Sequence, residues 1–501
     1  MRIKNALISV YHKEGLGPIV QSLSSNNTTI YSTGGTQTFI EEQGIKVKRV
    51  EDLTSFPSIF GGRVKTLHPK IFGGILARRN NKRDQSQIND FDIPYFDLVI
   101  VDLYPFEETV ASGAVEEEII EKIDIGGISL IRAAAKNFKD CWIISNRNQY
   151  GDALEVLNSA EGPKLDIRRR YALAAFDESS NYDTAIYRYF AGNRIDLKLS
   201  SRLKSTLRYG ENPHQEAAFF GNLDDALKQI HGKPLSYNNL LDIDATVNLI
   251  KEFTDTTVAI IKHNNACGLA TRDTLAKAWD DALAADPISA FGGVIAVNRT
   301  VDKETAEKMN SLFFEVLIAP EFEKDALKIL KSKKNRVLLI LKDFDFPSYN
   351  VRTALNGILV QTRDSDTDNK SNMKTVTDVS PNQEQINDLL FAAKICKHTK
   401  SNTIVLAKSG QLLSSGTGQT SRVDALNQAI DKANRFGFDL NGAAMASDAF
   451  FPFPDCVEIA HKAGITCVIQ PGGSIRDKES IAFCNDNKIA MVTTGIRHFK
   501  H

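Results

Sequence analysis

Short apolar runs recur along this chain, and each is followed by a turn and then by a helical pattern. Ala6 to Val10, Thr28 to Ser32 and Leu98 to Val101 are three such runs early in the sequence. β-Branched, apolar runs of this length are typical of buried strands. Strands that alternate with helices favour a parallel sheet, because a parallel pair needs a long crossover connection. The sequence therefore predicts an α/β protein whose N-terminal part is a small parallel domain.

One predicted strand in the middle of the chain ends in two ionisable side chains. The apolar run Val258 to Ile261 stops at Lys262 and His263, which buried strands rarely carry. Residues 264–268 contain two asparagines and a glycine and predict a turn, and residues 271–285 have a helical pattern. We therefore expect the Lys-His pair at the carboxyl end of a strand, just before a helix, where α/β folds bind ligands. Taken alone, such a pair is more often a solvated strand end without chemistry.

Length and composition bound the class of protein. With 501 residues, 42% of them hydrophobic, the chain should form two or more globular domains. The net charge of −1 argues against a nucleic-acid partner. No apolar run is long enough for a membrane span, and the first residues lack the apolar segment of a signal peptide, so we expect a cytoplasmic protein. The six cysteines form no C-x-x-C pair, which argues against a disulfide framework or a cysteine zinc site.

Two glycine-containing segments in the N-terminal part are suited to anions. Thr33-Gly34-Gly35-Thr36 lies between a predicted strand and a helix expected from about Gln37, where backbone N–H groups can hold a phosphate. The second segment, residues 61–69, combines two glycines with Arg63, Lys65, Thr66 and His68. This density of donors predicts an anion-binding loop, although the sequence has no P-loop motif.

These segments resemble the cyclohydrolase half of the AICAR transformylase/IMP cyclohydrolase family. The matching motifs are G-G-R-V-K-T-L-H-P from Gly61, L-Y-P-F from Leu103, D-I-G-G from Asp124 and R-A-A-A-K-N from Arg132. The resemblance implies a methylglyoxal-synthase-like domain over residues 1–195. Such a domain would close the formylated carboxamide ribotide FAICAR to inosine monophosphate (IMP) with loss of water.

The resemblance also implies site residues in this half. Lys136 would donate and accept the proton, with Asp124 and Tyr104 in the relay and Lys65 beside the reacting centre. The expected substrate contacts are Lys13, Thr33, Gly34, Gly35, Thr36, Arg63, Thr66 and Asp102. The last of these departs from the family, which usually has Asn before L-Y-P-F; an ionised carboxylate can accept a hydrogen bond but cannot donate one.

The C-terminal part carries the motifs of the family's transformylase half. Leu207 to Gln215 contains R-Y-G-E-N-P-H-Q, and Leu235 to Asp242 matches an asparagine-bearing substrate segment. The resemblance implies a transformylase domain over residues 196–501, with two cytidine-deaminase-like α/β subdomains at about 200–365 and 373–501. Residues 397–453 loosely repeat the plan seen around the Lys-His strand. The zinc signature of deaminases is absent, because His263 is followed by two asparagines and the chain has no C-x-x-C.

In this half the resemblance implies formyl transfer from 10-formyltetrahydrofolate, as co-substrate, to the 5-amine of AICAR, without a metal. A neutral His263 would take the amine proton, Lys262 would stabilise the oxyanion, and Asn402 would be a second donor. The implied ribotide contacts are Arg208, Tyr209, Asn239, Gly292, Glu315, Arg422 and Arg497. Those implied for folate are Phe450, Asp455 and Ser474.

Oligomeric state and one alternative function complete the expectations. Family resemblance implies a homodimer whose transformylase sites lie between subunits. In the alternative, the N-terminal domain has lost its activity and serves as a phosphate-binding regulatory module, for which Asp102 is the sequence support. A purely structural scaffold leaves Lys262 and His263 at a strand end unexplained.

Overall fold

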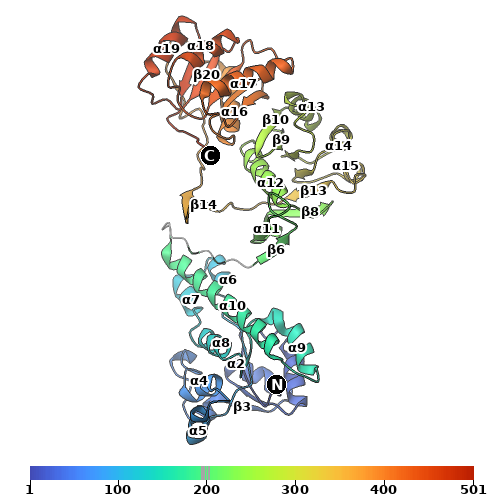
Figure 1. Cartoon of the computed structure of the whole chain (residues 1–501), viewed down its shortest axis with the longest axis vertical. Coiled ribbons are helices and arrows are strands. Elements are labelled where there is room, and N and C mark those ends of the chain that lie inside the picture. Colours follow the sequence, from blue (N-terminus) through green and yellow to red (C-terminus); the bar gives the residue numbers. More distant parts are fainter. Residues whose placement is uncertain (193–197, 199, 201–202) are drawn as a thin grey trace. The chain divides into compact units, whose positions relative to one another are not determined.

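The computed structural model describes residues 1–192, 198, 200 and 203–501, and the chain divides into two compact units, residues 1–202 and 203–501 (Figure 1). The predicted boundary at 195/196 falls on residues outside the described ones. We describe each unit by itself.

Unit 1 is built on a five-stranded parallel sheet in the order β3-β2-β1-β4-β5. Its strands are β1 (Asn5–Ser9), β2 (Thr29–Ser32), β3 (Val47–Arg49), β4 (Leu98–Val101) and β5 (Trp142–Ile144). Its helices are α1 (Leu16–Ser25), α2 (Gly34–Glu42), α3 (Val50–Thr54), α4 (Pro69–Leu76), α5 (Lys82–Asp90), α6 (Phe106–Ala111), α7 (Glu116–Glu121), α8 (Gly126–Lys136), α9 (Tyr150–Asn158) and α10 (Leu165–Ala191). The predicted parallel α/β domain is thus confirmed.

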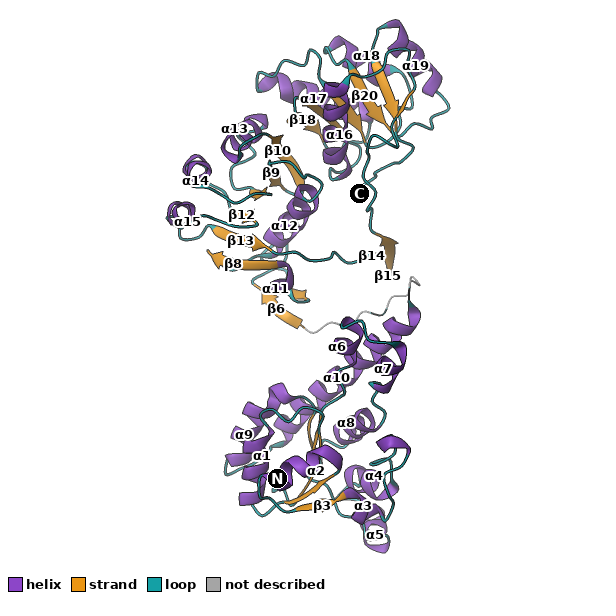
Figure 2. Ribbon diagram, turned by 180° about the vertical axis from the view of Figure 1, so that it is seen from behind, coloured by secondary structure: helices purple, strands orange, loops and turns teal. Residues whose placement is uncertain are grey.

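The central strands of unit 1 are apolar because helices cover both faces of the sheet. Figure 2 shows α1 and α9 on one side and α4 and α8 on the other. Ala6, Leu7 and Ile8 of β1 and all four residues of β4 are buried. Strands covered on both faces read as continuous apolar runs rather than alternating ones, which is why the sequence revealed them.

Unit 2 contains a twelve-stranded mixed sheet made of two topological repeats. The strand order is β16-β21-β20-β19-β17-β18-β10-β9-β11-β12-β13-β8. The first repeat has strands β8 (Leu227–His231), β9 (Thr257–Lys262), β10 (Asn265–Thr271), β11 (Val294–Val297), β12 (Val316–Ala319) and β13 (Val337–Leu341). The second has β16 (Lys374–Thr375), β17 (Ile404–Lys408), β18 (Gln411–Gly416), β19 (Ala444–Ser447), β20 (Cys467–Gln470) and β21 (Ala490–Thr493). β10 pairs antiparallel with β18 and joins the repeats into one sheet.

Helices occupy the same places in both repeats, so the loose repetition seen in the sequence is present in the fold. The first repeat has α12 (Tyr237–Ile250), α13 (Leu275–Ala285), α14 (Lys303–Asn310) and α15 (Lys324–Leu330). The second has α16 (Gln383–Lys397), α17 (Arg422–Arg435), α18 (Asp455–Lys462) and α19 (Asp477–Asp486). One apolar core includes α12 and α16 and runs across both repeats, whereas the other helices form two separate cores, one per repeat.

The segment after Lys262 differs from the expectation. Residues 264–268 do not form a turn before a helix; His263 and Asn264, at φ 50° and 64°, make a two-residue turn, and the chain returns as β10. Two left-handed residues in succession are the requirement of a tight β-hairpin. The Lys-His pair therefore lies at the tip of a hairpin, and α13 begins only at Leu275.

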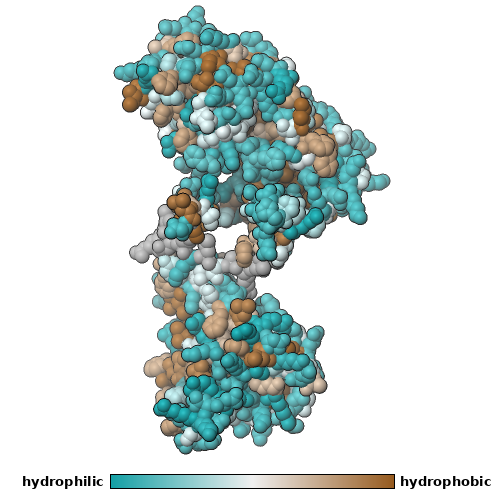
Figure 3. Space-filling view, viewed as in Figure 1, coloured by the Kyte–Doolittle hydropathy of each residue, from teal (hydrophilic) through white to brown (hydrophobic). Residues whose placement is uncertain are grey.

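Two further hairpins complete unit 2. β6 (Leu203–Leu207) pairs with β7 (Ala217–Phe220), which is followed by the short α11 (Leu223–Ala226), and β14 (Tyr349–Ala354) pairs with β15 (Gly357–Thr362). Hydrophobic side chains gather over the β14–β15 hairpin (Figure 3), where Val351, Leu355, Ile358 and Leu359 are exposed. Across the described ranges, no helix combines the length and apolar character needed to cross a bilayer.

Candidate active sites

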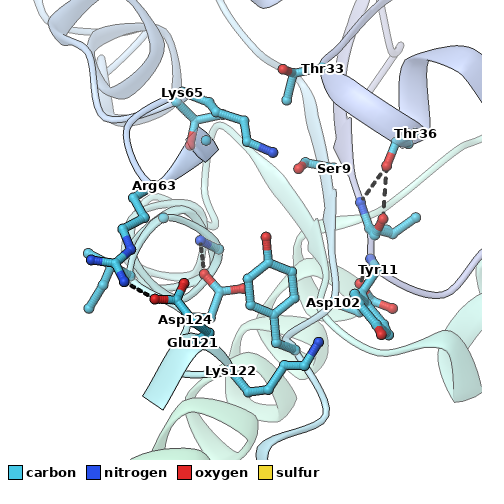
Figure 4. A pocket seen from close by; sticks show the side chains of 18 of the residues that line it. Ser9, Tyr11, Thr33, Thr36, Arg63, Lys65, Asp102, Glu121, Lys122 and Asp124 are labelled. Atoms are coloured by element: carbon cyan, nitrogen blue, oxygen red, sulfur yellow. Dashed lines mark hydrogen bonds and ion pairs between the residues drawn. The ribbon is translucent and has the colours of Figure 1, made fainter. Parts of the chain in front are cut away.

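A cavity of about 630 Å³ opens at the carboxyl edge of the sheet in unit 1. Its walls come from the end of β1, the start of α2, residues 61–66, the segment after β4 and the approach to α8 (Figure 4). Ten of the predicted site residues line it: Lys13, Thr33, Gly35, Thr36, Arg63, Lys65, Thr66, Asp102, Tyr104 and Asp124. The carboxyl edge is where parallel α/β sheets bind ligands.

One side of the cavity carries the positive charge of Lys65. The Lys65 side chain reaches toward the start of α2, where a Cβ on Gly34 would lie 3.6 Å from its Nζ. A Cβ on Gly62 would lie 2.5 Å from Lys65 Cε, so the glycine makes room for this side chain. Gly34 does not itself line the cavity, but it is the first residue of α2, which begins three residues before the predicted start at Gln37. The N-terminus of α2 and the Lys65 ammonium together suit an anion.

The opposite side carries a buried carboxyl group and a phenol. Asp124 is 8% exposed and accepts a hydrogen bond from the Gly127 backbone N–H at 2.6 Å. Burial raises the pKa of Asp124 above its usual range, even though this hydrogen bond opposes the rise. Burial, and next the nearby Asp124, raise the pKa of Tyr104. A carboxyl group of raised pKa beside a protonated phenol is an arrangement that can exchange a proton with a bound ligand.

Several predicted contact residues use their side chains to hold the chain itself. The Thr33 hydroxyl donates to Glu51 Oε1 at 2.8 Å, and the Thr36 hydroxyl bonds the backbone of Val10 at 2.9 and 3.0 Å. Asp102 accepts hydrogen bonds from the turn that follows β1. At these positions the donors available to a ligand are therefore backbone N–H groups rather than the threonine hydroxyls.

Lys136 is the predicted catalytic residue that the fold does not bring to this cavity. It is the last residue of α8, whereas Gly126 and Gly127 at the start of that helix line the cavity with Asp124. The ten steps from Gly126 to Lys136, at a rise of 1.5 Å each, separate the two ends of the helix by about 15 Å. The Lys136 side chain is exposed. The predicted proton-transfer role of Lys136 therefore has no geometric support in this unit.

The cavity also contains residues that the sequence did not single out. Lys122 Nζ lies 5.1 Å from the ring centre of Tyr11 and 6.0 Å from that of Tyr104, as cation–π contacts. Arg63 pairs with Glu121 across the opening. Lys122 lies two residues before Asp124, and this proximity to the D-I-G-G motif is the sequence feature that could have identified it as a cavity residue.

In unit 2, Lys262 is fixed and His263 is exposed. The Lys262 ammonium donates to the carbonyls of Phe291 and Gly292 at 2.9 and 3.1 Å. Gly292 has φ 71°, a left-handed conformation that favours glycine, and a Cβ there would lie 3.0 Å from Lys262 Nζ. Asp242 Oδ1 accepts from the Asn264 backbone N–H at 2.7 Å and so holds the hairpin turn against α12.

A second group of predicted residues meets near the C-terminus of the chain. Arg422 donates to Ser447 Oγ and Asp448 Oδ1, both at 3.2 Å, and lies 5.9 Å from the ring centre of Phe499. The guanidinium of Arg497 lies 4.3 Å from the centre of the same Phe499 ring. Asn402 donates to the Gln419 and Thr420 carbonyls in the loop that precedes α17.

The remaining predicted residues of unit 2 lie in separate places. Asn239 is buried in the capping box of α12, three residues before Asp242. Glu315 pairs with Lys233 at 2.5 Å, and Arg208, exposed on the surface, stacks on Tyr209. Phe450 and Ser474 lie in loops, and Asp455 begins α18. In the part of the chain that the structure describes, no three His, Cys, Asp or Glu side chains are grouped as metal ligands.

Comparisons with known proteins match both units. The family model of the AICARFT/IMPCHase bienzyme matches residues 134–432, and that of the MGS-like domain matches residues 15–129. The bifunctional purine biosynthesis protein PurH of Bacteroides thetaiotaomicron is 60% identical, covering 100% of this chain and 99% of that protein. The proteins of the same name from Acetivibrio thermocellus and Aquifex aeolicus are each 46% identical, covering 100% and 99% of this chain and 100% of their own lengths. With an MGS-like domain in unit 1 and relatives of this identity along its whole length, the chain belongs to the AICARFT/IMPCHase bienzyme family.

Proposed function

We propose that this chain catalyses the last two steps of purine synthesis, formyl transfer to AICAR and ring closure of FAICAR to IMP. Unit 1 would carry the cyclohydrolase activity and unit 2 the transformylase activity. One observation carries the assignment of unit 1. Its cavity contains both a positively charged site suited to an anion, formed by the start of α2 and Lys65, and the buried carboxyl group of Asp124. The six cysteines are all free and buried, which suits a reducing compartment such as the cytoplasm.

In ring closure, the carboxamide nitrogen attacks the formyl carbon, a proton leaves nitrogen, and an oxyanion forms before water departs. The start of α2 and Lys65 would bind the ribotide phosphate through backbone N–H groups and charge. Asp124, with its raised pKa, would exchange the proton, and the Tyr104 hydroxyl would donate to the oxyanion. These roles need no contribution from Lys136.

In formyl transfer, the aromatic amine of AICAR attacks the formyl carbon of 10-formyltetrahydrofolate. The amine is a weak nucleophile because its lone pair is delocalised into the imidazole. His263, exposed at the hairpin tip, would remove the amine proton. Lys262, held by two carbonyls beside it, would stabilise the tetrahedral oxyanion or protonate the departing folate nitrogen. The cluster of Arg422 and Arg497 supplies charge for the phosphate of the ribotide.

We also propose that the protein works as a homodimer that completes the transformylase site. The predicted transformylase residues of unit 2 lie in separate groups and do not line one common pocket. This separation supports a site that is shared between subunits. The β14–β15 hairpin offers a contact surface, because Leu355 is fully exposed and Leu359 is 62% exposed. Apolar side chains exposed together on a hairpin mark a surface for a partner.

Two substrates separate this proposal from the alternative of a regulatory N-terminal unit. Purified protein given AICAR and 10-formyltetrahydrofolate should form IMP, and protein given FAICAR alone should form IMP at least as fast. A regulatory module would leave FAICAR unchanged while formyl transfer continued. Absence of both reactions would refute the assignment as a whole.

A further inference from the structure

Two aspartates bracket strand β4 and hold the two ends of its neighbour β1. Asp97, just before β4, accepts hydrogen bonds from the backbone N–H groups of Lys4 and Asn5 at 2.6 and 2.8 Å. Asp102, just after β4, accepts from the backbone N–H groups of Tyr11 and His12, the latter at 3.0 Å. Asp97 thus fixes the entry to β1, and Asp102 fixes the exit, which faces the cavity.

Both carboxylate oxygens of Asp102 are engaged by this exit turn. Oδ1 accepts from Tyr11 N–H, and Oδ2 accepts from His12 N–H and lies 3.0 Å from His12 Nδ1. The side chain of Asp102 is 9% exposed and that of His12 is 24% exposed. The carboxylate therefore has little surface and few lone pairs left for a bound ribotide.

The same turn orients Lys13. The Lys13 ammonium donates to the Val10 carbonyl at 2.6 Å and to the Tyr11 carbonyl at 2.8 Å, and the side chain lines the cavity. These two carbonyls belong to the segment that Asp102 holds. Tyr11 belongs to the same segment and also lines the cavity (Figure 4), and its ring centre lies 5.5 Å from that of Tyr104.

We propose that Asp102 is a positioning residue, which acts on ring closure through the turn of Tyr11 and His12 and thereby through Lys13, rather than by touching the substrate. The inference rests on the proposed cyclohydrolase function of unit 1. Two backbone N–H groups and the adjacent His12 ring already occupy the Asp102 carboxylate.

A double-mutant cycle tests this directly, with FAICAR as substrate and kcat and KM measured separately. Lys13→Ala and Asp102→Ala should each raise KM about tenfold, the effect expected for a lost charged hydrogen bond, with smaller changes in kcat. If Asp102 acts through Lys13, the double variant should be no worse than Lys13→Ala alone. A double variant whose loss equals the product of the two single losses would overturn the proposal, since Asp102 would then contact the substrate itself.

Two further variants separate positioning from folding and from charge. Asp102→Asn keeps an acceptor for the turn and should recover most of the KM lost in Asp102→Ala; an Asn variant as poor as the Ala variant would contradict the proposal. Asp97→Asn is the matched control, since it perturbs the far end of β1 and should lower the melting temperature while leaving KM unchanged. A wild-type protein that did not cyclise FAICAR would refute the proposed function instead.

Discussion

Two glycines show how closely the helices of unit 2 approach its sheet. A Cβ on Gly268 of β10 would lie 2.1 Å from the Ala282 carbonyl oxygen of α13, and one on Gly416 of β18 would lie 1.7 Å from the Ala425 oxygen of α17. Both neighbours are backbone atoms, which cannot rotate away. In each repeat, therefore, the second strand of the hairpin has a glycine where the following helix packs.

We expect Gly416→Ala to destabilise unit 2 by about 1–3 kcal/mol, as overpacked cores do. The helix must move away from the strand to make room for the added methyl group. Gly357→Ala is a suitable control in the same unit, because its Cβ would meet only the Ala354 carbonyl at 3.8 Å. Urea unfolding of both variants gives the comparison, and equal stability of the two would show that α17 can shift freely.

At the scale of elements, a buried ionic cluster fastens the two repeats of unit 2 together. Glu252, just after α12, accepts hydrogen bonds from Lys397 Nζ at 2.7 Å and Thr367 Oγ1 at 2.7 Å, and lies 2.8 Å from His398 Nε2. Lys397 belongs to α16 of the second repeat. Burial alone would raise the pKa of Glu252, but the hydrogen bonds from His398, Lys397 and Thr367 lower it to about 2.

This lowered pKa predicts a dependence of stability on pH. A carboxyl group whose pKa falls from 4.5 to about 2 on folding contributes roughly 3 kcal/mol at neutral pH. The contribution is complete above pH 4.5, where the unfolded chain is also ionised, and disappears as the pH falls toward 2. The difference in unfolding free energy between the wild type and Glu252→Gln should therefore shrink below pH 4.5.

Chemical unfolding of the two proteins at a series of pH values measures that difference. The exposed Glu321 offers a control, and Glu321→Gln should differ little from the wild type at any pH. A difference for Glu252→Gln that stayed constant down to pH 3 would contradict the role given to this carboxylate.

The elements of the fold were predictable from the sequence to different degrees. The strands of unit 1 are continuous apolar runs, so β1, β2 and β4 could be located to within a residue or two. The hairpins of unit 2 were missed, because β10 and β18 contain small residues and glycines that resemble a turn in a single sequence. The first of them is recognised from the pairing of β9 with β10 and from the positive φ of His263 and Asn264, which are properties of the folded chain.

The candidate site shows the same division. Most of the polar residues in the glycine-containing motifs line the cavity of unit 1, since a motif fixes its own local geometry, but Gly34 and His68 do not. Tyr11 and Lys122 lie outside those motifs and reach the cavity only through the packing of separate segments. Lys136 belongs to a motif, yet the length of α8 places it far from Asp124.

For the whole molecule, the proposed dimer links oligomeric state to one of the two activities. Ile358→Glu places a charge beside the exposed Val351, on the apolar face of the β14–β15 hairpin, and we expect it to shift the protein toward monomer. The rate of formyl transfer should decrease as the fraction of dimer decreases, whereas ring closure of FAICAR should persist. Gln361→Glu adds the same charge at an exposed polar position of the hairpin and is the control. Sedimentation analysis and both assays check this prediction. An apolar-face variant that remained dimeric would contradict the role proposed for this surface.

The central claim is that two reactions occur at separate sites in separate units, and crossed variants test it most directly. His263→Ala and Lys65→Ala should each be assayed with AICAR plus 10-formyltetrahydrofolate, following FAICAR, and with FAICAR alone, following IMP. We predict that His263→Ala loses formyl transfer and keeps ring closure, and that Lys65→Ala does the reverse. Loss of both reactions in a folded single variant would contradict the division of chemistry between the two units.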